Sequence, residues 1–123
     1  MTENQGEPRD LALEYLYATE THAQDAPTPP GRAGRLADGV LAELEDLDNA
    51  IAAVSEHWSV ARMPAVDRNI LRIGLYELRH EPGVPTAVIL SEAVRMAETY
   101  STERSSSFVN GILGTLAKNV RDG

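Results

Sequence analysis

The sequence predicts an all-α fold with about six or seven short helices in two packed groups. Apolar residues recur at helical spacing in several segments, and no segment alternates apolar and polar residues for long enough to form a strand. Clusters of glycine and proline separate the helical segments. With 123 residues, of which 42% are hydrophobic, the chain is expected to fold as a single domain over residues 1–123 around one substantial core.

The most apolar helical segment runs from Val66 to Leu78, and we expect it to lie at the centre of the fold. Its apolar side chains cover about half of the helix circumference, so it needs neighbours on two sides. Leu71 lies between its two apolar lines and is predicted to be buried. Gly74 lies in the same arc, which predicts the close approach of another backbone. Glu77 also falls there, and pairing with an arginine in the core is favoured over a catalytic acid.

The N-terminal part predicts a helix followed by a stiff connection. Residues 1–8 are polar and expected to be flexible, and the first helix is predicted from Arg9 to His22. Residues 23–34 contain three prolines, which indicate a linker rather than a helix or an inner strand.

Helical spacing returns at Leu36 and continues to Val54, with a break near Asp46 and Asp48, either of which could cap a new helix. Trp58 follows and is expected to fill part of the core. An acidic cluster on the outer face is predicted to be a solvated surface, because the spacing does not fit a calcium loop; it consists of Glu43, Glu45, Asp46 and Asp48.

Two further helices follow the central one. Pro64 suits its first turn, and residues 81–83, Glu-Pro-Gly, end it. Ser105 is a candidate N-cap of the last helix. Phe108 lies about 100° from the apolar stripe of that helix. It is either a peripheral core residue or an exposed platform for base stacking, and spacing alone favours the core.

Composition and motif content favour a binding protein over an enzyme. The chain has no cysteine, which excludes disulfides and thiolate metal ligands, and its three histidines are isolated in sequence. No HExxH, GxSxG, phosphate-binding glycine loop or dinucleotide glycine pattern occurs. We therefore expect no catalytic residues, no metal and no cofactor.

Charge is distributed unevenly. The formal net charge is −8, with twelve acids and three arginines in residues 1–58 against seven acids and eight basic residues in residues 59–123. This acidic total argues against general affinity for nucleic acids, so RNA contact would need the second half, or Arg9 and backbone donors. The chain shows no secretory signal and no run of about 18 apolar residues, which predicts a soluble cytoplasmic protein.

Three segments together form a recognisable pattern. The first is Val66–Leu78. The second contains Val84-Pro85, then Glu92-Ala93, and ends with residues 107–113, Ser-Phe-Val-Asn-Gly-Ile-Leu. The third is the first helix, with Arg9-Asp10-Leu11-Ala12 and Leu16-Tyr17. The first two segments, in this order and spacing, resemble the NusB family of bacterial transcription antitermination factors. The first helix is similar to the start of that family, so the resemblance covers nearly the whole chain.

The resemblance implies an all-helical fold of two helical sub-bundles. It implies binding to boxA RNA in the leaders of ribosomal RNA operons, together with NusE, which is also a ribosomal protein of the small subunit. It also implies that the pair joins the RNA polymerase elongation complex with other factors, and it implies no catalysis. Some members of the family form homodimers through surfaces that overlap the RNA face.

The matched positions imply a set of site residues. The arginine-rich cluster typical of the family start is replaced by residues 5–8, Gln-Gly-Glu-Pro, with only Arg9 matching. Tyr17 and Phe108 match positions at or near the RNA surface, which reverses the preference stated for Phe108. The link before Phe108, where the family often carries an acid, a histidine and a lysine, here reads Arg-Ser-Ser-Ser over residues 104–107, and Arg104 restores one contact. Ser105 and the free N–H groups at the start of the last helix can bind a phosphate. The predicted RNA face consists of Arg9, Tyr17, Arg104, Ser105 and Phe108.

Asp67 matches an acidic position that the family uses toward NusE. Its local alternative is a favourable charge in the first turn of the central helix. At the level of the whole protein, a helical protein-interaction module of the same fold, with weak or lost RNA binding, stays open as an alternative.

Overall fold

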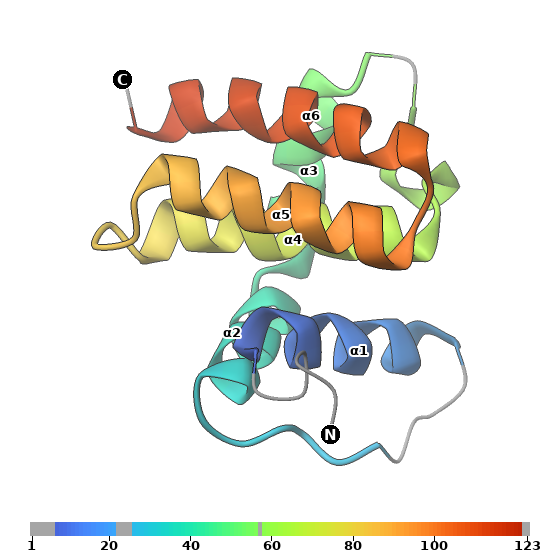
Figure 1. The fold of residues 1–123 in the computed structure, drawn as a ribbon, viewed down its shortest axis with the longest axis vertical. Helices are drawn as coiled ribbons and strands as arrows, with labels where there is room; N and C mark the ends of the chain where they lie inside the picture. Colours follow the sequence, from blue (N-terminus) through green and yellow to red (C-terminus); the bar gives the residue numbers. More distant parts are fainter. Residues whose placement is uncertain (1–6, 22–25, 57, 122–123) are drawn as a thin grey trace.

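In the computed structural model, the described residues are 7–21, 26–56 and 58–121, and they form six α-helices and a short 3-10 turn without any strand. Figure 1 shows two groups. The lower group contains α1 (Pro8–Thr21) and α2 (Gly31–Ala42). The upper group contains α3 (Leu44–Val54), the turn η2 (Val60–Arg62), α4 (Ala65–His80), α5 (Thr86–Tyr100) and α6 (Glu103–Arg121). The predicted all-α fold is confirmed.

Helix α4 lies at the centre, as its wide apolar arc predicts. It packs against each of the other five helices. Leu71 is fully buried, and the hydrophobic core runs continuously from α1 through α4 to α6. The two helix groups therefore share one core rather than forming separate ones.

Two glycines let neighbouring helices approach α4 closely. At Gly74, an added Cβ would lie 2.7 Å from Leu113 Cδ1 of α6, so the neighbour is a side chain and not the backbone that the sequence predicted. At Gly39 of α2, an added Cβ would clash with Cζ and the hydroxyl oxygen of Tyr76 on α4. These contacts fix how α6 and α2 pack on the central helix.

Several local predictions differ from the structure. Helix α2 begins at Gly31, so residues 31–34 are helical and not part of the linker. The break between α2 and α3 falls at Glu43, and neither Asp46 nor Asp48 caps a helix. Trp58 is 52% exposed and does not fill the core. The predicted end of the first helix at residue 22, like most of residues 1–8, lies outside the described residues.

The N-cap of α6 also differs from the prediction. The backbone N–H of Ser105 donates to Oγ1 of Thr102 at 3.3 Å, which makes Thr102 the capping residue. Ser105 lies within the first turn of α6 and is buried.

Candidate nucleic-acid interface

Three of the predicted RNA-contacting residues reach the surface. Tyr17 on α1 is 43% exposed. Arg104, in the first turn of α6, is exposed and has no acidic partner among the described residues. Phe108 is partly buried and packs against the core, so it combines the core position favoured by spacing with a remaining accessible part.

Arg9 is buried in an ion pair and is not free to bind a phosphate. Its guanidinium group is buried and donates to both carboxylate oxygens of Glu77, each at 2.8 Å. Burial alone would lower the pKa of Arg9, but bonding to Glu77 outweighs it and raises the pKa. The carboxylate of Glu77 also accepts from Arg32 at 3.0 Å. The predicted core pairing of Glu77 is confirmed, and the charge of Arg9 is already balanced inside the protein.

Ser105 and Asp67 belong to one hydrogen-bonded cluster. The two carboxylate oxygens of Asp67 accept from the hydroxyls of Ser101, at 2.6 Å, and Ser105, at 2.7 Å. Asp67 is only 3% exposed. Because Ser101 is the C-cap of α5 and Ser105 lies in α6, this cluster holds the α5–α6 turn against the first turn of α4. We call it the turn clamp.

A second cluster joins α1 to the end of α5 and was not predicted from the sequence. The carboxylate of Asp10 accepts from Arg95 at 2.6 and 3.1 Å and from the hydroxyl of Tyr100 at 2.5 Å. Bonding to Asp10 raises the pKa of Arg95, which stays charged. In the sequence, the one signal for this cluster is that Tyr100 stands at the end of its helix, where a side chain often remains exposed.

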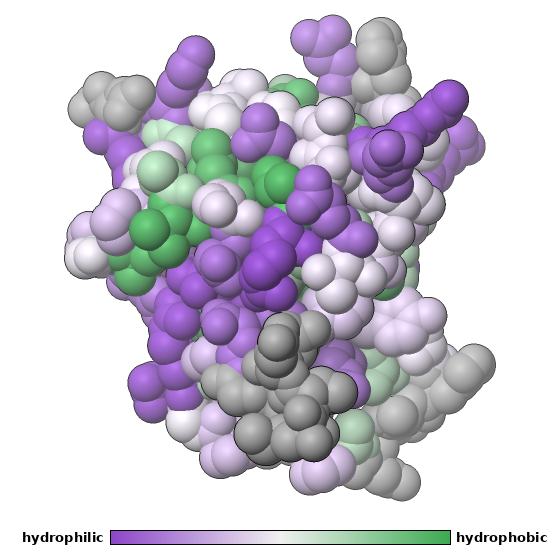
Figure 2. All heavy atoms as spheres, viewed as in Figure 1, coloured by the Kyte–Doolittle hydropathy of each residue, from purple (hydrophilic) through white to green (hydrophobic). Residues whose placement is uncertain are grey.

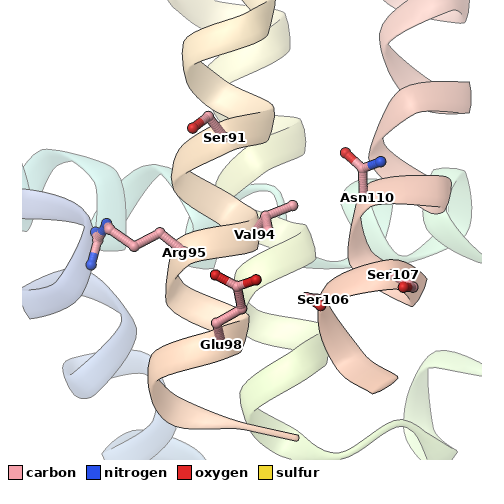
Figure 3. Close-up of a pocket in the computed structure, with 7 residues that line it drawn as sticks. All are labelled: Ser91, Val94, Arg95, Glu98, Ser106, Ser107 and Asn110. Carbon is pink, nitrogen blue, oxygen red and sulfur yellow. The ribbon is translucent and has the colours of Figure 1, made fainter. Parts of the chain in front are cut away.

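A hollow of about 490 Å³ lies beside this cluster, between α5 and α6. Figure 3 shows that Arg95 runs away from the hollow toward α1. Glu98 lies on the α5 side of the hollow, and two serines and an asparagine lie on the α6 side. The lining residues are Ser91, Val94, Arg95, Glu98, Ser106, Ser107 and Asn110. Two of these residues, Ser106 and Ser107, directly precede Phe108 in the sequence.

A third cluster ties the C-terminal end of α1 to α4 and α3. Glu20 accepts from Arg68, from Asn69 at 2.5 Å and from Arg72 at 2.9 Å. Arg72 also donates to both oxygens of Asp48, each at 2.7 Å. Burial would raise the pKa of Glu20, but its three donors lower it overall. Figure 2 shows that hydrophilic side chains on this face of the molecule gather at its centre and toward its left edge, near the level where the two helix groups meet in Figure 1.

The acidic cluster predicted as a solvated surface is largely paired with α4. Asp48 pairs with Arg72, and Asp46 with Arg79 at 2.6 Å. Glu43 lies 2.8 Å from the ring of His80. The described residues contain no group of three or more histidines and acids placed to hold a metal ion. None of the described helices is both long and apolar enough to cross a membrane.

Comparison with known proteins identifies the family of this chain. The model of the NusB family matches residues 2–118. The chain belongs to the NusB family. The NusB family relative from Sorangium cellulosum, a transcription antitermination protein, is 41% identical over 91% of this chain and 90% of its own length. The relative from Leifsonia xyli, with the same description, is 43% identical over 94% of this chain and 83% of its own.

Solved NusB structures share the fold. NusB from T. maritima superposes with a TM-score of 0.81 at 33% identity, covering 90% of this chain and 88% of that one. A second structure contains the antitermination factors NusB and NusE in complex with double-stranded RNA. It matches with a TM-score of 0.77 at 24% identity, over 91% of this chain and 94% of that one, a level that shows the shared fold alone. The family to which this chain belongs acts in transcription antitermination and not in catalysis.

Proposed function

We propose that this protein is an antitermination factor that binds boxA RNA of ribosomal RNA operons together with NusE. The family match over residues 2–118 carries the proposal. The solved structure of NusB and NusE in complex with double-stranded RNA supports it, because the NusB of that complex has the same fold. We further propose that the pair acts within the RNA polymerase elongation complex.

The proposed RNA face consists of Tyr17, Arg104 and Phe108, with Ser105 placed behind it. The two aromatic rings supply stacking surfaces, and Arg104 supplies a charge that has no acidic partner among the described residues. Backbone N–H groups at the start of α6 can receive a phosphate without adding positive charge. Arg9 stays in the proposal as the support of α1, because its guanidinium group is bonded to Glu77.

The test of the RNA proposal is a titration of labelled single-stranded boxA RNA with and without NusE. Affinity is expected to be weak alone and to improve when NusE is present, because the acidic half of the chain opposes the RNA. Phe108→Ala is expected to weaken binding by about 5- to 100-fold with an unchanged circular dichroism spectrum. With few phosphate contacts, the logarithmic salt slope should be about −1 to −2.

Two outcomes separate the alternatives. Equal affinity of Phe108→Ala and the parent would remove α6 from the RNA face. No detectable boxA binding by the parent with NusE at low salt would favour the interaction module that has lost RNA binding.

A homodimer would compete with RNA for an overlapping surface. Size-exclusion chromatography at several protein concentrations tests whether the chain forms such a homodimer.

We propose an indirect role for Asp67 in binding NusE, through the turn clamp. Asp67→Asn and Ser105→Ala both remove part of this clamp, but only the first changes a carboxylate that NusE could contact. Loss of NusE affinity in both variants, measured by isothermal titration calorimetry, would support positioning by the clamp. Loss in Asp67→Asn alone would indicate direct contact. Unchanged affinity in both, with reduced stability, would exclude any partner role.

A further inference from the structure

Two exposed tyrosines lie on α1 and α5, two helices that hydrogen bonds of Asp10 join. Among the described residues, the large apolar or aromatic side chains that are exposed are Tyr17, Leu41, Trp58, Val88 and Tyr100. Tyr17 is 43% exposed on α1, and Tyr100 is 40% exposed at the end of α5.

Asp10 connects the two rings. The hydroxyl of Tyr100 donates to Asp10 at 2.5 Å. Tyr17 follows Asp10 by seven residues on α1, which places both on the same side of that helix, about 10 Å apart along its axis. The hydroxyl of Tyr100 is therefore bonded to the side of α1 that also carries Tyr17.

The environment of Tyr100 prepares its ring for a flat ligand. Its hydroxyl is bonded to Asp10, which fixes the ring and reduces the entropy lost on binding. Arg95 bonds to both oxygens of Asp10 and offsets its negative charge, so the carboxylate repels a nearby phosphate less. A fixed ring with an accessible part is what base stacking requires.

We propose that Tyr17 and Tyr100 form a two-ring platform on which unpaired bases of single-stranded RNA stack. This inference rests on the proposed function and extends the RNA face from α6 to α1 and the end of α5. The hollow between α5 and α6 connects the two parts: Arg95 on its wall bonds to Asp10, and Ser106 and Ser107 precede Phe108. Stacking accepts any base, so the platform adds affinity more than sequence discrimination.

The test uses three variants, titrated by fluorescence anisotropy with labelled single-stranded boxA RNA in the presence of NusE. Tyr100→Leu removes the ring and is expected to weaken binding by about 5- to 100-fold. Tyr100→Phe keeps the ring but loses the bond to Asp10, and its affinity should stay within about threefold of the parent. Val88→Ala, on the same helix with 42% exposure, is the matched control and should bind as the parent does.

Each remaining outcome decides against the platform. If the parent binds RNA and Phe108→Ala weakens it, but Tyr100→Leu does not, the platform is excluded and the proposed function stands. If Tyr100→Phe and Tyr100→Leu lose affinity equally, in step with melting temperature, the hydroxyl acts only in folding. If Tyr100→Leu weakens NusE binding without RNA, the surface belongs to the protein partner. If the parent binds no RNA, both proposals fall.

Discussion

An arginine at the position of Arg9 can either bind an RNA phosphate or form a buried ion pair that stabilises the fold. An arginine at the start of the first helix resembles a phosphate contact, yet here its guanidinium group is buried against Glu77. Removing one partner of a buried ion pair leaves an uncompensated charge, whereas replacing both partners with apolar residues is often neutral. Stability measurements can therefore distinguish the two purposes.

We expect Arg9→Met to lower the free energy of unfolding by about 3–5 kcal/mol, measured by urea denaturation, because the buried carboxylate of Glu77 then keeps, among the described residues, only the partly exposed Arg32 as a partner. The double variant Arg9→Met with Glu77→Leu should recover much of this loss. Arg104→Met, at an exposed position without an acidic partner in the described part of the chain, is the matched control and should change stability by less than about 0.5 kcal/mol. If Arg9→Met changes stability little but strongly weakens RNA binding, then Arg9 contacts an RNA phosphate as the sequence predicts.

At the scale of helices, the contact of α2 with α4 depends on the missing side chain of Gly39. Gly39→Ala improves helix propensity but forces the Tyr76 ring to move, and overpacking of this kind costs about 1–3 kcal/mol. Gly114→Ala on α6 gains the same propensity with no atom within 4 Å of its new Cβ, and should stabilise by about 0.5–1 kcal/mol. Comparing the two thermal unfolding midpoints isolates the contact; equal midpoints would mean that the ring moves without cost.

The helices themselves were predictable because their apolar periodicity is local. The central position of α4 and the core pairing of Glu77 follow from the sequence pattern alone. The turn clamp and the Asp10 cluster were not predictable, since Asp10 and Tyr100 are 90 residues apart and each looks like an ordinary surface residue. Trp58 was misplaced because side-chain size favours burial, whereas the chain places it in a surface loop.

For the whole molecule, the ion pairs between the helix groups make stability depend on pH. Glu20 has a pKa lowered from its ordinary value of 4.5 by Arg68, Asn69 and Arg72, against the opposing effect of burial. Because the unfolded chain binds a proton at higher pH than the folded one, this contribution is present above about pH 5 and is lost as pH falls below 4.5.

Urea midpoints measured between pH 7 and pH 3 are expected to fall in the acidic part of this range. Glu20→Gln should be less stable than the parent at pH 7, and the difference should shrink toward pH 3. Glu45→Gln, at an exposed position without an ion pair among the described residues, should follow the parent throughout. A constant difference between Glu20→Gln and the parent would show that the charge of Glu20 contributes nothing.

The exposed position of Trp58 determines how these experiments can be read. It is the only tryptophan of the chain and is 52% exposed in the folded state, so its indole is already in contact with water. Unfolding changes its surroundings little, and its fluorescence emission should shift only slightly. Helical circular dichroism is therefore the suitable signal for unfolding. The fluorescence emission of Trp58 can instead be used to detect a partner that covers its loop.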